Sequence, residues 1–390
     1  MMNRSTLSTT EAAIRVEPDH GTPASDRLHS LDVFRGITIA AMLLVNNPGS
    51  WGAVYPPLLH AEWHGWTPTD LIFPFFLFIV GVSMAFSFGK ALESGAERSS
   101  VMRKAAIRSA KLIALGLILH SFPWWRLDPS TLRIPGVLQR IGLAFLIASA
   151  LVLWTRRAGR AAVIAVLLLG YWAVMMLVPV PGSGAGVLEP GRDLGAYIDR
   201  LVFGTSHLWV QARTWDPEGL LSTLPAVATV LLGTFAGEWL RSGRVSGDKL
   251  RGLLLAGLAS VAAGLLWNPL FPINKPLWTS PYVLFTAGAA LICLAFCYWS
   301  IDIRGHRRWG FPFFLFGMNA IAAFFLSSLF ARVIGMPIGG GPSLKTLVHE
   351  PVFTSWLPPH DASLAFALSF VLLWTGIMWG FHRLGVFWKV

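Results

Sequence analysis

Ten long apolar stretches limit what this chain can fold into. Each holds about 17 to 24 mostly apolar residues, and a helix needs about 20 to cross the hydrocarbon core of a bilayer. A segment in lipid must satisfy its own backbone hydrogen bonds, which favours helices. The stretches lie at 31–47, 70–89, 105–122, 136–154, 161–180, 222–240, 250–268, 280–300, 311–334 and 362–382. They predict an all-α fold, a polytopic membrane helix bundle of about ten transmembrane helices.

The composition agrees with a surface that meets lipid. Of the 390 residues, 54% are hydrophobic and only 13% are charged, whereas soluble domains carry about 25% charged residues. The net charge of +11 would suit a nucleic-acid-binding protein, but the basic residues lie in short gaps between apolar stretches. We therefore expect membrane lipid as a partner and no nucleic acid.

The positions of Lys and Arg predict the orientation. Basic gaps stay in the cytoplasm, and most of the 31 Lys and Arg residues fall on the inner side when the N-terminus is placed there. We expect both termini in the cytoplasm and a multi-pass protein of the bacterial inner membrane. Residues 1–30 are polar and lack the apolar region of a signal peptide. They predict a disordered cytoplasmic tail, followed by a single transmembrane domain at 31–390.

The first long outward gap carries reactive side chains. Asn46 ends the first apolar stretch, His60 and His64 follow in the gap, and Asp70 opens the second stretch. A neutral imidazole can take a proton from an amine or attack an acyl carbon, and a carboxylate can fix its tautomer. An Asn amide can donate to the oxyanion of a tetrahedral intermediate. This set has the parts for acyl transfer, although His64 is also typical of an interfacial histidine.

A metal site is not expected. The string HAEWH at 60–64 differs from the HExxH zinc motif. The two cysteines, Cys293 and Cys297, lie four apart in one apolar stretch, where small apolar residues pack.

Basic residues gather at the inner end of the first and third stretches. Asp32 and Arg35 lie one helical turn apart, so Arg35 either pairs with Asp32 or reaches an anionic ligand that enters from the cytoplasm. The ligand interpretation is favoured by the nearby Arg103, Arg108 and Lys111, because clustered cations bind phosphates through charge-assisted hydrogen bonds. Membrane orientation and contact with lipid headgroups would equally explain most of these residues.

Other polar residues fall near the outer end of the bundle. Arg140 lies inside a stretch and needs a partner or a wet cavity. Asp216 and Glu218 suit a cationic amine substrate, but pairing with Arg133 or Arg213 would explain them equally. Glu62, in the histidine gap, and Lys275, between the seventh and eighth stretches, join the substrate-binding candidates. Asn319, inside the ninth stretch, either serves the site or bonds a neighbouring helix.

Several strings occur together in a fixed order over residues 31–320. They are LDVFRG, VN before the first gap, HAxWxGxTxxDLxFPxFxF, RIPGVLQR, DPEG, NKxLW and GMN. In these strings the chain resembles the heparan-alpha-glucosaminide N-acetyltransferase family and its shorter bacterial relatives. The histidine-to-aspartate string is the most specific of them.

The resemblance implies an acetyl-CoA-dependent N-acetyltransferase. Acetyl-CoA would bind as co-substrate from the cytoplasm, and its acetyl group would pass to an amino sugar of the glucosamine type on the periplasmic side. The histidine of the family falls on His60, its asparagine on Asn46 and its aspartate on Asp70. The cofactor-binding candidates are then Arg35, Arg103, Arg108, Lys111 and Asn319. Family analogy also implies a homodimer.

A transporter for amino sugars or organic anions is the alternative from another functional class. It would explain the charges inside the bundle and the string FPFFLF, which occurs at 73–78 and again at 311–316, as in an inverted repeat. A transporter predicts uptake of substrate without consumption of acetyl-CoA.

Overall fold

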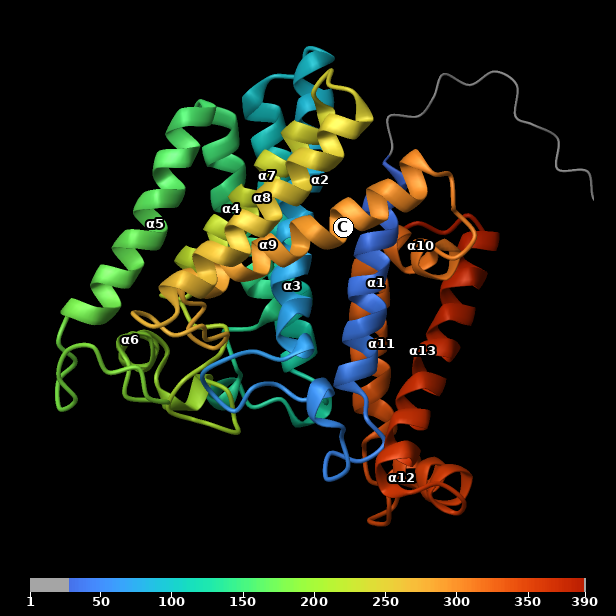
Figure 1. Ribbon diagram of the computed structural model, residues 1–390. Coiled ribbons are helices and arrows are strands. Elements are labelled where there is room, and N and C mark those ends of the chain that lie inside the picture. The colour runs from blue at the N-terminus through green and yellow to red at the C-terminus, as the bar shows by residue number, and fades with distance from the viewer. Residues whose placement is uncertain (1–27, 389–390) are drawn as a thin grey trace, which may run out of the picture.

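The structure, a computed structural model, describes residues 28–388 (Figure 1). The predicted disordered tail falls largely on residues outside this range. Its last two residues are an exception, because His29 and Ser30 already belong to the first helix. The backbone N–H of Ser30 donates to the Asp302 carboxylate at 3.3 Å, which ties the start of that helix to another segment.

The described residues are helical and contain no β-strand. The α-helices are α1 (His29–Asn46), α2 (Ile72–Glu93), α3 (Arg98–His120), α4 (Val137–Trp154), α5 (Arg157–Leu177), α6 (Leu194–Phe203), α7 (Thr223–Arg241), α8 (Ser246–Trp267), α9 (Ser280–Cys297), α10 (Phe311–Met318), α11 (Ala320–Ile334), α12 (Leu344–His349) and α13 (Pro359–Arg383). The short 3-10 or π turns are η1 (Pro56–Leu58), η2 (Pro68–Leu71), η3 (Trp124–Arg126), η4 (Pro129–Thr131), η5 (Thr205–His207), η6 (Tyr298–Ile303) and η7 (Glu350–Thr354). The all-α prediction is confirmed.

All ten predicted stretches form helices, but fewer qualify as membrane spans by length and composition. Seven helices in the described range do so, or eight when α10 and α11 count as one span. The two long helices that fall short are α1, which contains Asp32 and Arg35, and α3, which contains five Lys or Arg residues between Arg98 and Lys111. The number of about ten spans and the cytoplasmic location of the termini stay predictions.

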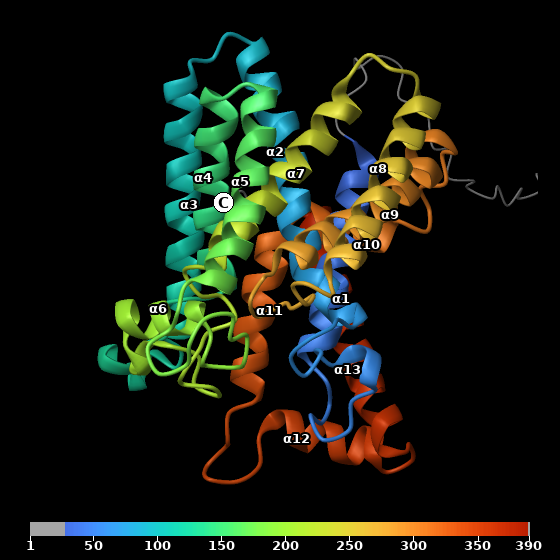
Figure 2. The same ribbon diagram turned by 60° about the vertical axis from the view of Figure 1, so that its left-hand side comes forward.

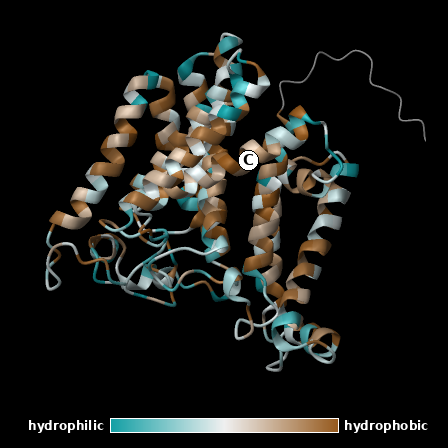
Figure 3. Cartoon of the chain, in the orientation of Figure 1, coloured by the Kyte–Doolittle hydropathy of each residue, from teal (hydrophilic) through white to brown (hydrophobic). Residues whose placement is uncertain are grey.

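The connections between helices separate into two groups. The turns from α2 to α3, from α4 to α5 and from α7 to α8 lie together at one end, which we call the basic end (Figure 1). The long segments 47–71, 178–222 and 335–358 lie at the opposite end, which we call the loop end. Figure 3 shows apolar helices between polar loops. This is the grouping that the sequence predicts for the two faces of the membrane.

Glycines let two helix pairs approach closely. A Cβ on Gly81 of α2 would lie 1.9 Å from a carbonyl oxygen of α7, and one on Gly317 of α10 would lie 1.9 Å from a carbonyl oxygen of α1. Only glycine fits such positions, as is common where membrane helices pack. Figures 1 and 2 show the two resulting groups, α2–α5 with α7 and, beside them, α1 with α10, α11 and α13.

The prediction of a single helix for 311–334 is wrong. The structure divides it into α10 and α11, which meet at an angle of 86°. Asn319 forms the break, with φ −127° and ψ 39°. Its buried side chain bonds to the backbone of Val386 and Trp388 and so satisfies groups outside its own helix.

Candidate active site

A capping turn holds Asp70 against the histidine loop. Thr67 and Asp70 form a capping box at the start of η2, with Pro68 at its first position. The Asp70 Oδ2 atom accepts hydrogen bonds from the backbone N–H groups of Ala61 and Thr67, both at 3.0 Å. The other oxygen, Oδ1, lies 2.7 Å from Nδ1 of His60. The predicted pairing of His60 with Asp70 is thus present.

This pairing defines which nitrogen of His60 can react. The Asp70 side chain is 1% exposed, whereas that of His60 is 52% exposed. A carboxylate accepts only, so the short contact requires Nδ1–H to donate to Asp70. Nε2 then carries the lone pair, which can accept a proton or attack an acyl carbon.

Lys275 approaches the same pair from the connection between α8 and α9. Its Nζ atom lies 3.6 Å from Oδ1 of Asp70 and 2.9 and 3.1 Å from the two ring nitrogens of His60. The neighbouring Asn274 is buried and donates from Nδ2 to the carbonyl of Trp63 at 2.9 Å, which joins the two loops. Burial lowers the pKa of Lys275, and the negative charge of Asp70 opposes part of that shift.

Sequence reasoning missed Tyr282 entirely. This fully buried residue on α9 donates its hydroxyl to the backbone carbonyl of Asp70 at 2.6 Å. Its ring packs edge-on against Trp278 with centroids 5.3 Å apart, and Trp278 contacts Phe73 in the same way at 5.1 Å. Tyr282 lies in a uniformly apolar stretch, so its spacing gave no signal of a polar role.

The two outward carboxylates have an arginine partner. Arg133 donates from Nε to Asp216 at 2.8 Å, and from Nη2 to Asp216 and to Glu218, both at 2.6 Å. Of the alternatives that the sequence left open, pairing with Arg133 is therefore present. A role of Asp216 and Glu218 in substrate binding stays a prediction.

Arg140 is buried beside this network, with 1% of its surface exposed. Its Nη2 donates to the carbonyl of Gly219 at 3.1 Å and to the hydroxyl of Ser222. The guanidinium also lies 5.1 Å from the ring of Trp278, a cation–π contact. A buried charge needs hydrogen-bond partners, and the turn before α7 provides two of them for Arg140, the Gly219 carbonyl and the Ser222 hydroxyl.

That turn is also held by a buried carboxyl group on α6. Asp199 is 2% exposed, and its Oδ1 accepts a hydrogen bond from the backbone N–H of Leu220 at 2.8 Å. Burial raises the pKa of Asp199 to about 7, and the negative charge of Asp216 adds to the shift.

Replacing Asp199 with Asn is expected to weaken the pH dependence of stability. Between about pH 4, the ordinary carboxyl pKa, and about 7, the folded protein keeps a proton that the unfolded chain releases. The free energy of unfolding therefore falls as pH rises through this window, by about 2 to 4 kcal/mol. The thermal midpoint of the wild type should drop between pH 5 and pH 8, and that of Asp199→Asn should drop less. An identical drop in both proteins would contradict the assignment.

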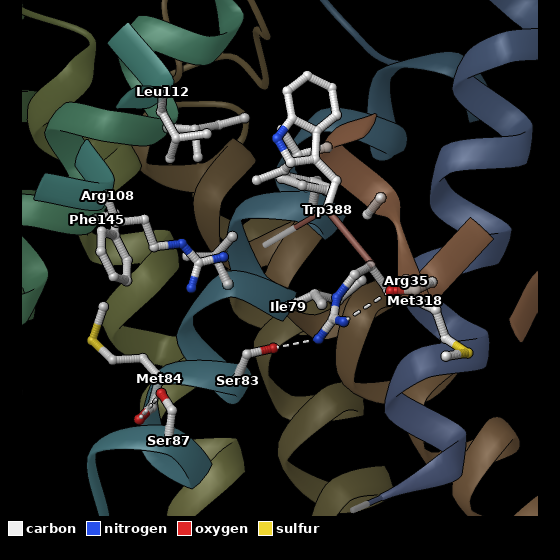
Figure 4. A pocket seen from close by; sticks show the side chains of 16 residues that line it. Arg35, Ile79, Ser83, Met84, Ser87, Arg108, Leu112, Phe145, Met318 and Trp388 are labelled. Atoms are coloured by element: carbon white, nitrogen blue, oxygen red, sulfur yellow. Dashed lines mark hydrogen bonds between the residues drawn. The ribbon is translucent and has the colours of Figure 1, made fainter. Parts of the chain in front are cut away.

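A cavity of about 360 Å³ lies inside the bundle between α1–α4, α10 and α11. The guanidinium groups of Arg35 and Arg108 both point into it (Figure 4). Arg35 donates to Ser83 at 2.7 Å and to the Gly317 carbonyl at 3.1 Å, and it also pairs with Asp32 at 3.1 Å. The ion pair that the sequence posed as one alternative is therefore present, and contact of Arg35 with an anionic ligand stays a prediction.

A second, larger cavity opens toward the basic end. It has a volume of about 940 Å³ and shares Arg35, Ser83 and Ser87 with the first. Its lining also includes Lys90, Glu93, Arg241 and Lys249. The two cavities therefore adjoin at Arg35, Ser83 and Ser87, and basic residues line both of them.

Apolar side chains lie between the first cavity and the loop end. A gap of only about 20 Å³ adjoins the first cavity and shares Phe76, Ile141 and Ile321 with it. Phe73, one helical turn after Asp70, lines the far side of the gap. The inner cavity and the His60 loop are therefore separated by a thin hydrophobic layer.

Four other candidates belong neither to the His60–Asp70 pair nor to the lining of the first cavity. Arg103 and Lys111 are exposed on α3 and do not line the first cavity. Glu62 is exposed in the histidine loop, and Asn46 is exposed at the end of α1. Within the described range Asn46 makes no hydrogen bond to His60. The roles of these four residues stay predictions.

Known proteins match this chain over its membrane core. A family profile described as "Heparan-alpha-glucosaminide N-acetyltransferase, catalytic" matches residues 27–263, more than half of the chain. The chain is 29% identical over 429 aligned positions to the Homo sapiens protein named heparan-alpha-glucosaminide N-acetyltransferase, covering 93% of this chain and 60% of that protein. The Mus musculus protein of the same name is 30% identical over 364 positions, covering 79% of this chain and 54% of the relative.

The matched region contains His60, Asp70, Arg35 and Arg108, whereas Lys275 lies beyond its end. The chain spans 60% or less of the length of these two relatives. The profile match extends over the first helix, the histidine loop and α2–α4, whereas α10 and α11, which also line the cavity, lie beyond its end. The chain belongs to the heparan-alpha-glucosaminide N-acetyltransferase family.

Proposed function

We propose that this protein transfers an acetyl group from acetyl-CoA, bound from the basic end, to the amine of a glucosamine-type sugar at the loop end. The observation that carries the proposal is the exposed His60 held 2.7 Å from the buried Asp70. Family membership and the basic cavity on the other side of the hydrophobic layer support it.

The two cavities suit the donor. Arg35 and Arg108 face the same space, and the lining of the first cavity contains neither Asp nor Glu. Guanidinium groups bind phosphate oxygens through charge-assisted hydrogen bonds. We place the phosphates of CoA near these residues and the pantetheine arm along the apolar wall toward Phe76 and Phe73.

The reaction at His60 balances in either of two ways. In direct transfer, Nε2 removes one proton from the acceptor ammonium, the amine forms a C–N bond with the thioester carbon, and the C–S bond breaks as the thiolate of CoA takes the second amine proton. In the covalent route, Nε2 attacks the thioester carbon, and the C–S bond breaks as CoA leaves and takes a proton from solvent. A neutral amine then attacks the acetylimidazole, the bond to Nε2 breaks, and the remaining amine proton passes to Nε2. Kinetics distinguish them, because the covalent route is ping-pong.

Lys275 can take part in both routes, because its ammonium group lies within about 3 Å of the imidazole. The same ammonium can stabilise the negative oxygen of the tetrahedral intermediate. Asn46 remains our second proposed donor to that oxygen.

The test uses the whole protein in detergent or nanodiscs. Acetyl-CoA is supplied with and without glucosamine, and free CoA thiol is followed. We expect release that depends on glucosamine, and release of about one thiol per enzyme without acceptor would identify an acetylated intermediate. If acetyl-CoA neither binds nor turns over with any amine, the proposal fails, and glucosamine uptake into proteoliposomes would then test the transporter.

The structure gives the transporter no specific support. The two copies of FPFFLF begin helices of different kinds, because α2 continues for 22 residues whereas α10 ends after eight. Inverted repeats would place similar interruptions in both halves.

Replacing Arg108 with Ala is expected to weaken binding of acetyl-CoA by about 10- to 100-fold. A hydrogen bond to a charged group contributes roughly 1.5–3 kcal/mol, and Arg108 points into the cavity (Figure 4). Arg103→Ala is the matched control, because Arg103 lies on the same helix outside the cavity lining. Calorimetric titration of both proteins measures the affinities, and equal losses would show that only the overall charge of α3 matters.

A further inference from the structure

The chain turns back into the bundle after α13. Gly385 has φ 67°, and its N–H donates to the carbonyl of His382 at 3.1 Å, while Val386 donates to Phe381 at 2.9 Å. This pair of bonds is the Schellman motif, which ends a helix and reverses the chain. The direction of the segment Leu384–Trp388, which we call the strap, is therefore built into its own sequence.

Asn319 holds the strap in place. It lies at the break between α10 and α11 and is 2% exposed. Its Oδ1 accepts a hydrogen bond from the backbone N–H of Trp388 at 2.9 Å, and its Nδ2 donates to the carbonyl of Val386 at 3.2 Å. One side-chain amide thus bonds both a donor and an acceptor of the strap backbone.

The end of the strap lies in the cavity that contains the two arginines. The Trp388 side chain lines this cavity together with Arg35 and Arg108, and Figure 4 shows the indole over the space between their guanidinium groups. Its ring also packs edge-on against Phe325 of α11, with centroids 5.9 Å apart. The indole, which is 38% exposed, therefore forms part of the wall of the cavity into which both arginines point.

We propose that the strap is an autoinhibitory element that occupies the donor cavity and must leave before the donor binds fully. The inference rests on the proposed function, since it takes this cavity as the donor site. The first cavity, about 360 Å³, is at the lower end of the roughly 300–1,000 Å³ of small-molecule pockets. The second cavity, about 940 Å³, can hold much of a coenzyme, so the strap would limit only the part of the donor that passes Arg35 into the first cavity, and removing the indole would widen that part.

Such a strap makes donor affinity depend on how often the cavity is open. When the binding-competent state is only a fraction of the population, the apparent dissociation constant rises by the inverse of that fraction. Opening breaks the two bonds to Asn319 and withdraws Trp388, while the bundle itself stays intact.

Removing the strap should therefore tighten donor binding. We expect deletion of residues 386–390 and the variant Trp388→Ala each to lower the dissociation constant of acetyl-CoA by about three- to tenfold. Trp379→Ala, which removes an exposed indole on α13 outside the cavity, is the matched control and should bind as the wild type does. Weaker or unchanged binding in both strap variants would overturn the proposal, since the indole would then be a wall of the donor site or a bystander.

A second readout does not depend on the ligand. Ala320 lines the first cavity but not the second, so Ala320→Cys places a thiol in the first cavity alone, and labelling with a water-soluble maleimide reports access to it. Labelling should be several-fold faster when the strap is deleted, with the protein that retains only Cys293 and Cys297 as background. If acetyl-CoA binds no variant but labelling accelerates, the strap stands and the donor assignment falls. An unchanged labelling rate overturns the strap.

Discussion

His60→Ala is expected to reduce glucosamine-dependent release of CoA by about 10²–10⁴-fold, the contribution typical of a positioned acid–base group. The variant removes Nε2, which does not contact the buried Asp70, lies 3.1 Å from Lys275 Nζ and can take a proton or carry an acetyl group. Both routes need it, so the loss does not depend on which of them operates. Turnover at saturating acetyl-CoA and glucosamine measures the effect.

The matched control is His64→Ala in the same loop. His64 is exposed, its Nδ1 lies 3.3 Å from Nδ2 of Asn274, and its ring lies edge-on to Trp63 with centroids 6.3 Å apart. We expect this variant to keep its rate within about threefold, since a surface substitution away from buried features changes free energies by less than about 0.5 kcal/mol. A rate above a tenth of wild type in His60→Ala, or equal losses in both variants, would remove His60 from the chemistry.

The pairing of His60 with Asp70 could be predicted from the sequence because it is local. The two residues lie ten apart, and Asp70 also forms a short-range capping box with Thr67. Lys275 and Tyr282 contact the same carboxylate residue from more than 200 positions away. Sequence spacing does not predict contacts over such a separation. Only the packing of α9 and the segment before it against the histidine loop shows these two contacts.

The helices were predictable for a similar reason, and the break at Asn319 was not. A stretch long and apolar enough to cross a bilayer becomes helical whatever surrounds it. The stretch 311–334 has that composition throughout, and its interruption comes from bonds between Asn319 and the strap, about 70 residues later in the chain. The sequence likewise offered Arg133 and Arg213 as partners for the two carboxylates that follow α6, and only the contact distances show that the partner is Arg133.

Asp70→Asn is the second change with a large expected effect, about 10³–10⁴-fold in turnover, as when the carboxylate of a catalytic triad becomes an amide. The Asn oxygen can still accept from the backbone N–H groups of Ala61 and Thr67, as Asp70 Oδ2 does at 3.0 Å, so the loop should keep its shape. The Asn NH₂ would then face Nδ1 of His60 and donate to it. The imidazole proton would move to Nε2, and the nitrogen that faces the acceptor would cease to be a base.

The pH profile separates this tautomer effect from simple loss of structure. The negative charge of Asp70 holds up the pKa of Lys275, which burial lowers. Without that charge the pKa of Lys275 falls further, so the ammonium loses its proton at a lower pH and the alkaline limb of the residual activity should shift downward. Asp128→Asn, an exposed carboxylate at the same end of the bundle, should change neither rate nor profile. If Asp70→Asn kept its rate and profile, Asp70 would serve only to cap η2, and the reactive tautomer of His60 would need another source.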